Sequence, residues 1–523
     1  MQEANIKNYQ QSRALTSTTF VIILIAIFYL ISGLFLTKYP TAYMDEAWND
    51  SVFISLLKNR EFKFSVFRES PGYYPMGLFY LLTHYISFKF FGYTLFAARL
   101  PSLLCIGGST LFIYLIIQRL TSDNRLGFFA ALLFSVTETA VYASHLARQE
   151  ALFLLWSLLC VYLFLKMVKS DLLYKHFLFG LLCGVAFEIH LNAFVLCLCF
   201  TLLYCFYENR NWSEKIKRVI AWGIGSASML LLWFLVRYLM DPLIFKNVFS
   251  LGASHGLFSD LTARMEKNII FFANNFWEPR YHRKMLEFTI LCISVIGSCY
   301  LLKSKTYDIR YKSALKLFLI CLFSYNIGFL IMNIFDTNFI ILVYPFFMVL
   351  FCMVLFGLQD LFKKVKVSAQ KIIVILILIF AGQNMYAFYK FSPSDYEAYL
   401  AQVKAFIPPG SIVIGDVRFG YGFFENYDYI ALRDLSYAIN VKNMSSEEYF
   451  KKFQIQYVLY TEYWDYMINH DTDYGKIDRE IDKIKFKQFI DNDTELTGVV
   501  HDYVYGMANQ KFGNCWTKIY RIK

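Results

Sequence analysis

Long apolar runs separated by short polar segments dominate the first 390 residues. The runs are close to 20 residues long, the length that an α-helix needs to cross a bilayer. The chain is also 57% hydrophobic with a mean hydropathy of +0.42, whereas a soluble domain is about half apolar. The pattern therefore predicts a polytopic α-helical membrane protein with eleven spans, at 19–37, 94–118, 126–143, 150–168, 174–190, 192–208, 217–238, 286–303, 313–333, 338–357 and 371–389.

A further run, Tyr74–Phe91, is apolar enough to cross, but His84 and Lys89 interrupt it. Whether it crosses decides which side every later loop faces. If it lies along the surface, six segments on the N-terminal side hold 20 Lys and Arg, and the short loops opposite hold only Arg148. Short basic loops remain in the cytoplasm, so we expect Tyr74–Phe91 to be an interfacial amphipathic helix. The six segments are 1–18, 119–125, 166–176, 208–218, 303–316 and 360–371.

This arrangement predicts a multi-pass protein of the plasma (inner) membrane with a cytoplasmic N-terminus. Two long loops then face the outside: 38–93, with two surface helices, and 239–285. The first apolar run is long and lacks a small-residue cleavage pattern, so it is typical of an anchor rather than a cleaved signal peptide. Glu150, at the start of the fourth span, falls on the same face as Asp45.

The composition changes after Lys390, and residues 393–523 are polar. Ser411–Ile414 and Tyr457–Tyr460 have the pattern of strands, and Ser446–Phe453 that of a helix between them. We therefore divide the chain into a transmembrane domain, 1–392, and a small external α/β domain, 393–523, which is large enough for its own core.

The formal net charge is +11, a value also found in nucleic-acid-binding proteins. Here the basic residues collect in short loops between apolar runs, so we expect no nucleic-acid partner and contact with membrane lipids instead. Ten of the 11 cysteines fall in apolar runs, where cysteine acts as a small hydrophobe. Only Cys515 is in a polar region, and no metal-ligand spacing is present.

Four short motifs occur in a defined order along the first 200 residues. Asp45-Glu46 opens a helix just beyond the first span, and a Pro/Gly/Tyr stretch precedes the interfacial helix. Arg99 and Arg148 each stand at the entrance to a span. In this order and topology the chain resembles the GT-C glycosyltransferases, especially the protein O-mannosyltransferase-like and lipid A aminoarabinose transferase-like members. The motifs are Met44-Asp45-Glu46-Ala47-Trp48, Ser70-Pro71-Gly72-Tyr73-Tyr74-Pro75, Ala98-Arg99-Leu100-Pro101-Ser102 and Ala147-Arg148-Gln149-Glu150-Ala151.

One departure concerns the second motif. Many relatives have two adjacent prolines after a basic residue or histidine where this chain reads Tyr73-Tyr74-Pro75-Met76. A basic ligand for the substrate at this place is therefore not expected.

The resemblance implies a donor sugar linked to a polyprenyl phosphate and inverting transfer on the external face. A hydroxyl acceptor is a poor nucleophile, so a positioned carboxylate accepts its proton during attack; by resemblance this is Asp45. The leaving lipid phosphate needs cationic donors, and a guanidinium forks onto phosphate oxygens. The sugar and the acceptor (surface glycan, lipid A or protein) remain open.

Six further residues are candidates for substrate binding, each with a structural alternative. Arg148 and Glu150 stand two apart at the mouth of a span, where they could also be an interfacial arginine and a helix N-terminal carboxylate. An ionised group inside a membrane is usually paired or functional, so Arg99 either binds substrate or clamps an external-loop carboxylate. The others, from the first loop and the turn between the fifth and sixth spans, are Glu46, Glu69 and His190.

We expect no required metal or other cofactor, although oligosaccharyltransferase relatives use a divalent ion. A lipid-linked sugar transporter or flippase is an alternative function, but transporters often have paired halves with broken helices, and no such symmetry is evident. A glycan polymerase or ligase with a lipid-diphosphate donor is the other alternative. Its large external loop would come late in the chain, whereas the largest loop here comes early.

Overall fold

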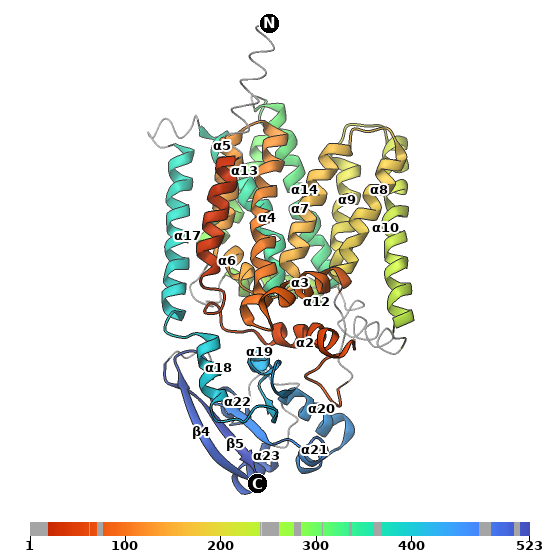
Figure 1. Ribbon diagram of the computed structural model, residues 1–523. Coiled ribbons are helices and arrows are strands. Elements are labelled where there is room, and N and C mark those ends of the chain that lie inside the picture. The colour runs from red at the N-terminus through yellow and green to blue at the C-terminus, as the bar shows by residue number, and fades with distance from the viewer. Residues whose placement is uncertain are drawn as a thin grey trace.

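A bundle of long apolar helices stands above a smaller domain that contains a β-sheet (Figure 1). The computed structural model describes residues 19–61, 63–70, 77–240, 242, 261–276, 284–305, 307–333, 337–359, 368–469, 483–506 and 513–523. The chain is mostly helical and has the predicted class of fold, a polytopic helical domain followed by a small α/β domain.

The bundle consists of the helices that the apolar runs predict. Six described helices, α4, α7, α10, α13, α14 and α17, are long and apolar enough to cross a membrane, or seven with the bent pair α5 and α6. Three others are apolar but shorter, so the predicted number of eleven spans remains a prediction. The bounds are Thr19–Gly33, α4 Leu95–Thr121, α5 Asn124–Ser135, α6 Glu138–Ser144, α7 Gln149–Met167, α8 Leu173–Gly184, α9 Phe194–Phe206, α10 Trp212–Met240, α13 Met285–Lys303, α14 Ile309–Met332, α15 Tyr344–Gly357 and α17 Ala369–Phe391.

The predicted span 126–143 is not one straight helix. It breaks between α5 and α6, whose axes differ by 66°. The Thr137 hydroxyl accepts a hydrogen bond from the N–H of Ala140 at 3.3 Å and so caps the new helix, while it donates to the carbonyl of Phe134 at 2.8 Å. Threonine at a helix start satisfies a backbone donor that has no partner within the helix. The bend places Glu138, the first residue of α6, at the end of the bundle that faces the smaller domain.

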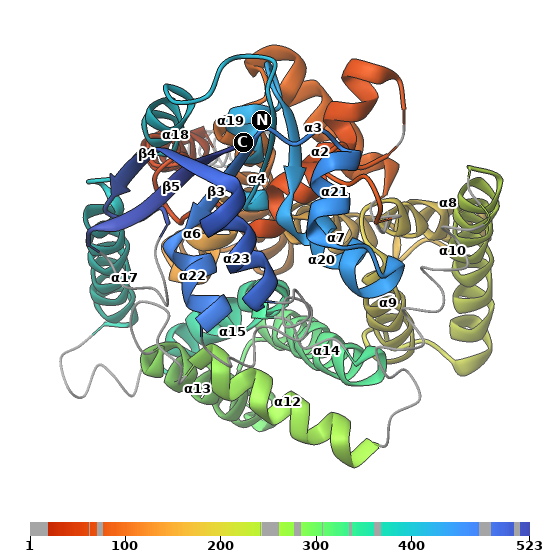
Figure 2. The ribbon, with the colours of Figure 1, turned by 90° about the horizontal axis from the view of Figure 1, so that it is seen from below.

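Three helices lie across that end of the bundle: α2 Met44–Asn59, α3 Leu78–Phe91 and α12 Leu261–Phe276 (Figures 1 and 2). The crosswise course of α3 is the one expected of an interfacial helix. Its start packs against the turn between α8 and α9, where the N–H of Leu78 donates to Glu188 Oε2 at 2.9 Å. A Cβ atom at Gly77 would collide with the carbonyl of Glu188, so only glycine allows this approach.

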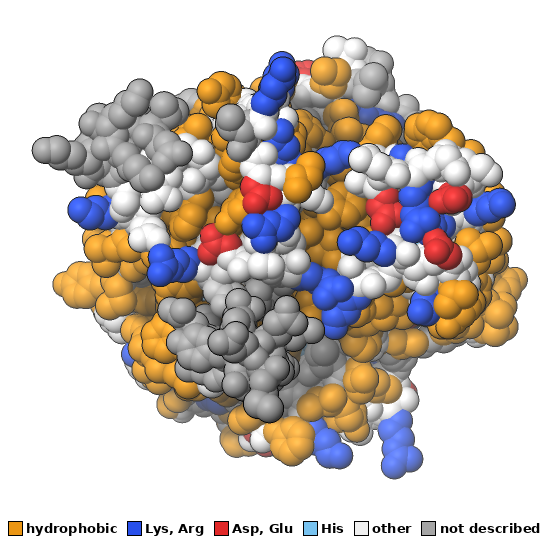
Figure 3. Space-filling view, turned by 90° about the horizontal axis from the view of Figure 1, so that it is seen from above, with side chains coloured by type: hydrophobic (Ala, Val, Ile, Leu, Met, Phe, Trp, Pro, Cys, Tyr) orange, Lys and Arg blue, Asp and Glu red, His pale blue; other side chains and the backbone are white. Residues whose placement is uncertain are grey.

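The opposite end of the bundle carries many basic side chains (Figure 3). Over α8, α9 and α10, Arg218 reaches Asp171 at 2.8 Å and Glu208 at 3.2 Å, and Arg210 contacts the same two carboxylates. The helix Thr19–Gly33 begins at this end, whereas the smaller domain lies at the other (Figure 1).

The smaller domain is built on a five-stranded sheet in the order β2-β1-β3-β5-β4. Strand β1 is parallel to β2 and β3, and β5 is antiparallel to β3 and β4. The predicted strands are present as β1 and β3, and the predicted helix as α21. The bounds are α18 Tyr396–Lys404, β1 Ile412–Gly415, α19 Gly420–Phe423, β2 Asp428–Ala431, α20 Leu432–Lys442, α21 Ser446–Lys452, β3 Tyr457–Thr461, α22 Glu462–Asn469, α23 Lys483–Asp493, β4 Thr494–Asp502 and β5 Cys515–Ile522.

This domain packs directly on the first loop of the membrane domain. Asp434 is fully buried and accepts hydrogen bonds from three successive backbone N–H groups, those of Arg68, Glu69 and Ser70, at 2.7–3.2 Å. The backbone N–H of Ala431 also donates to the carbonyl of Val66 at 2.9 Å. The domain therefore fixes the stretch that leads from α2 to α3.

Candidate active site

Asp45, Arg148 and Glu150 form one ion-paired cluster, which the structure assembles from two distant parts of the chain. Arg148 Nη1 donates to Asp45 Oδ2 at 2.5 Å, and Arg148 Nη2 donates to Glu150 Oε1 at 2.8 Å. The guanidinium thus lies between the two carboxylates. The expected placement of Glu150 on the same face as Asp45 is present in the structure.

Local structure fixes each member of this cluster. Asp45 is in the first turn of α2, and Glu150 in the first turn of α7. Arg148 is the N-cap of α7 with extended backbone angles, so its side chain leaves the helix start toward α2. The guanidinium also lies over the ring of Tyr43, with its carbon 5.5 Å from the ring centroid. Asp45 is 29% exposed, whereas Arg148 is 14% and Glu150 4% exposed, so the cluster has one accessible edge.

Glu46 and Arg99 form a different pair, completely buried beside the cluster. Arg99 Nε and Nη2 donate to the two oxygens of Glu46, each at 2.8 Å. The remaining donors of Arg99 bond to the backbone carbonyls of Leu36, Tyr39, Pro40 and Thr41. Glu46 also accepts from the N–H of Tyr43 at 2.6 Å and of Ala147 at 2.7 Å. This is the arrangement of a structural clamp, the second of the two alternatives for Arg99.

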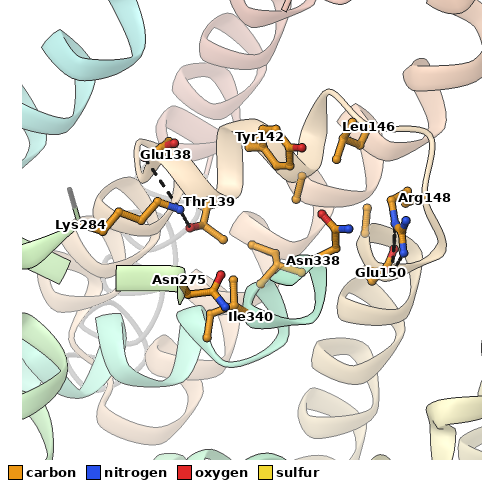
Figure 4. A pocket seen from close by; sticks show the side chains of 13 residues that line it. Glu138, Thr139, Tyr142, Leu146, Arg148, Glu150, Asn275, Lys284, Asn338 and Ile340 are labelled. Carbon is orange, nitrogen blue, oxygen red and sulfur yellow. Dashed lines mark hydrogen bonds and ion pairs between the residues drawn. The ribbon is translucent and has the colours of Figure 1, made fainter. Parts of the chain in front are cut away.

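A small pocket opens beside Arg148 and Glu150, between α6, α7, α12 and the segment before α15 (Figure 4). Its volume of about 30 Å³ holds roughly one or two water molecules, so lining side chains must move apart to admit a sugar. Figure 4 shows Arg148 and Glu150 at one end and Lys284 with Glu138 at the other. Polar side chains between the two ends are Tyr142, Asn275 and Asn338.

The end formed by Lys284 and Glu138 has no counterpart among the sequence-predicted residues. Lys284 Nζ donates to the Thr139 hydroxyl at 3.2 Å and lies 3.9 Å from Glu138 Oε2. Glu138 is 3% exposed. Two features of the sequence could have indicated these residues. Glu138 is a charged residue inside the apolar run 126–143, and Lys284 is a lysine just before the span 286–303.

The other predicted binding residues lie farther from this cluster. Glu69 forms an ion pair with Lys452 of the smaller domain and therefore faces that domain. His190 accepts from the N–H of Asn192 at 3.0 Å and packs against Phe153 and Phe339, close enough to Glu150 for an electrostatic interaction. The stretch 71–76, and residues 243–260 and 277–283 of the second loop, lie outside the described residues.

Behind α2, a buried polar group joins the two surface helices to the smaller domain. Asp50 is fully buried and accepts from the Tyr421 hydroxyl at 2.5 Å. Its other oxygen lies 4.0 Å from His84 Nε2. Burial raises the pKa of Asp50 well above its usual value and lowers that of His84 to about 4, so burial favours the uncharged form of both groups.

Comparison with known proteins shows one partial family match and several structures with a similar fold. The model of the family "Dolichyl-phosphate-mannose-protein mannosyltransferase" matches residues 74–247. No curated protein sequence matches the chain. Among solved structures, ArnT from Cupriavidus metallidurans bound to undecaprenyl phosphate is similar with a TM-score of 0.60 and 12% identity, over 95% of this chain and 97% of that one.

Two further structures have the same kind of likeness. The apo state of the same ArnT has a TM-score of 0.61 at 12% identity, over 96% of this chain and 98% of that one. The Archaeoglobus fulgidus oligosaccharyltransferase in complex with Zn and sulfate has a TM-score of 0.52 at 10% identity, over 84% of this chain and 68% of that one. The likeness to ArnT extends over nearly all of both chains, so the chain has an ArnT-like fold, the fold that the sequence resemblance predicts.

Proposed function

We propose that this chain, a membrane glycosyltransferase with the GT-C fold, moves a sugar from a polyprenyl-phosphate donor to a hydroxyl acceptor at the Asp45–Arg148–Glu150 cluster. The observation that carries the proposal is the guanidinium of Arg148 held between two carboxylates at the edge of a pocket. The matched ArnT structure bound to undecaprenyl phosphate supports a lipid phosphate as the donor carrier.

Arg148 binds the donor phosphate in this proposal. Guanidinium groups form paired hydrogen bonds with phosphate oxygens, and Glu150 holds the side chain of Arg148 in place from the other side. A bound phosphate competes with Asp45 for Nη1, because both are anionic acceptors for the same donor. Donor binding therefore frees the Asp45 carboxylate, which is the more exposed of the two.

The freed Asp45 accepts the proton of the acceptor hydroxyl. The acceptor oxygen forms its bond to the anomeric carbon while the bond from that carbon to the phosphate oxygen breaks, with inversion. The proton passes to Asp45, and the electron pair leaves with the phosphate, whose growing charge Arg148 stabilises. Glu150 acts as a positioning residue because it reaches the reaction only through Arg148.

This mechanism assigns the necessary positive charge to Arg148 rather than to a metal ion. Among the described residues no group of three or more His, Cys, Asp or Glu side chains is placed to hold a metal. The guanidinium lies where a cation between Asp45 and Glu150 would bind. Transfer without added divalent metal and in the presence of a chelator is the expected result.

We further propose that the cluster faces outward from the plasma (inner) membrane. The basic end of the bundle (Figure 3) is the one that the positive-inside rule assigns to the cytoplasm. The cluster, the surface helices and the smaller domain lie at the opposite end (Figure 1). The acceptor is then a hydroxyl of a surface glycan, of lipid A or of an exported protein.

Purified protein tested with a polyprenyl-phosphate sugar decides the proposal. Asp45→Asn keeps the side-chain size and removes the proton acceptor, so transfer should fall by about a hundredfold or more while donor binding is retained. Glu61→Gln, in the same loop but half-exposed, is the matched control and should transfer normally. Transfer by Asp45→Asn at the wild-type rate would overturn the assignment of Asp45.

A further inference from the structure

The smaller domain contacts α2, the surface helix whose first turn carries Asp45. We infer that the hydrogen bond from Tyr421 to Asp50 positions this helix, so that Tyr421, a residue of the smaller domain, is a positioning residue for the proposed general base. The inference rests on the proposed function, since it concerns how Asp45 is placed for the same reaction. It makes the smaller domain a part of the catalytic unit.

Three contacts from the smaller domain follow α2 along its length. The guanidinium carbon of Arg433 lies 4.4 Å from the ring centroid of Trp48. The Tyr421 hydroxyl donates to Asp50 Oδ2 at 2.5 Å. Lys58, in the last turn, donates to two successive backbone carbonyls just after α19. Because α2 lies between the bundle and this domain (Figure 1), the smaller domain supports the helix from its second turn to its last.

The Asp50 side chain depends on this one hydrogen bond. Asp50 is fully buried, and Tyr421 is 4% exposed. Among the described residues Tyr421 gives the carboxyl group its only hydrogen bond, because Oδ1 of Asp50 has no partner there. A buried polar group without a partner is costly. Loss of the Tyr421 hydroxyl therefore favours a shift of α2 that brings Asp50 to another donor or to water.

Asp50 and Glu46 together fix the rotation of α2. They are four residues apart, so they lie on the same face of the helix, about one turn from each other. Arg99 of the bundle holds Glu46, and Tyr421 of the smaller domain holds Asp50. A helix that is fixed at one point can still turn about that point, whereas a second fixed point one turn away removes most of this freedom.

Asp45 responds to rotation of α2 because it lies on a different face of the helix from these two points. Helical side chains reach about 5–6 Å from the axis, so a rotation of about 10° moves the Asp45 carboxylate by about 1 Å. A misplacement of that size can lower a rate by about 10²-fold. In the proposed reaction the donor phosphate displaces Asp45 from Arg148, so the position of the base then depends on α2.

Tyr421→Phe removes only the hydroxyl group and tests the inference in the full-length protein. With the polyprenyl-phosphate sugar and the acceptor that support wild-type transfer, we expect kcat to fall by about tenfold or more, with little change in KM for the donor. Undecaprenyl phosphate without sugar should bind at least as tightly as it does to wild type, because a displaced Asp45 competes less for Arg148. Loss of activity through unfolding would weaken this binding instead.

A matched control and a second pair of variants isolate the hydrogen bond. The Tyr460 hydroxyl donates to Asp465 at 2.9 Å within the smaller domain, so Tyr460→Phe makes the same chemical change without involving α2 and should transfer normally. Asp50→Leu breaks the bond from the other side and should lower kcat similarly, while Asp50→Asn keeps an oxygen acceptor and should lose less. The double variant Tyr421→Phe/Asp50→Leu should be no slower than the slower single variant.

The same measurements separate this inference from the proposed function. Absence of transfer by wild-type protein that binds undecaprenyl phosphate would defeat the proposed function itself. Wild-type kcat in Tyr421→Phe, or equal losses in Tyr421→Phe and Tyr460→Phe, would overturn only the positioning role. Losses that multiply in the double variant would overturn it as well. If Asp50→Leu does not fold, Tyr421→Phe and its control decide.

Discussion

The two adjacent carboxylates at the start of α2 each meet an arginine, but the two pairs differ in every other respect. Arg99 is fully buried, and its donors are shared between Glu46 and four backbone carbonyls. Arg148 lies at a pocket and bonds to side-chain carboxylates, one of them partly exposed. A pair whose partners are all fixed can hold a fold together, whereas an accessible ion pair can exchange a partner for a ligand.

The helix geometry explains how neighbouring residues reach such different surroundings. Successive side chains on an α-helix point about 100° apart, so Asp45 and Glu46 cannot share one environment. Glu46 points into the bundle toward α4, and Asp45 toward the start of α7. The difference predicts that variants of one pair affect folding and variants of the other affect transfer.

Loss of the buried pair should have the largest effect. Arg99→Met leaves the Glu46 carboxylate buried without its cation, which typically costs about 3–5 kcal/mol, so we expect little folded protein. Glu46→Gln removes the other charge of the same pair, so it should also lower the yield of folded protein. Arg119→Met, at the exposed end of the same helix α4, is the control. Detergent-solubilised yield and thermal unfolding measure the result, and normal unfolding of Arg99→Met would refute the clamp.

Variants of the accessible ion pair should lose transfer activity rather than stability of the fold. Removal of one charge-stabilising donor typically lowers kcat by about 10²–10³-fold, so we expect that loss for Arg148→Ala with nearly normal thermal unfolding. Arg148→Lys keeps the charge but not the paired donors and should be intermediate. Glu150→Gln should also impair transfer, through a displaced Arg148. Transfer kinetics and donor-lipid affinity test this, and wild-type kinetics in Arg148→Ala would return the residue to a structural role.

Much of the frame could be predicted from the sequence because hydrophobic run length and loop charge are local signals. They located the bundle helices, the crosswise α3 and the common face of Asp45 and Glu150. The choice between two roles for Arg99 could not be made, because it depends on four carbonyls from a turn about 60 residues earlier.

The far end of the pocket was not predicted for a related reason. Glu138 lies within an apolar run, and only the break at Thr137 makes it the start of a separate helix at the pocket. Lys284 comes from another part of the chain and meets it only in the folded protein. Similarly, no local pattern connects Asp434 with residues 68–70.

The comparison of buried with accessible groups extends to the contact between the domains. Asp434 is buried with three backbone donors, whereas Asp428 forms a half-exposed ion pair with Arg68. Loss of the charge should cost about 1–3 kcal/mol at Asp434 and about 0–1 kcal/mol at Asp428. Asp434→Asn should therefore increase proteolytic cleavage near Arg68, with Asp428→Asn as the control. Equal cleavage of the two variants would contradict this difference.

Asp50, a third carboxylate on α2, contrasts with both ion-paired neighbours, since it is buried near the neutral groups Tyr421 and His84. Its pKa is raised in the folded protein, so the folded state binds more protons than the unfolded state. Stability from this group is complete below the unfolded pKa of about 3.8 and is lost as pH rises toward the folded pKa.

The pH dependence of unfolding can isolate this contribution. His84 has a lowered pKa of about 4, so it contributes the opposite slope, but only between about pH 4 and 6.5. Both wild type and Asp50→Asn retain His84, so the difference between their pH profiles reports Asp50. As the pH rises above the unfolded pKa of Asp50, the wild type should lose stability relative to the variant, measured as the difference in thermal unfolding. Parallel pH profiles would mean that Asp50 is ionised in the folded protein.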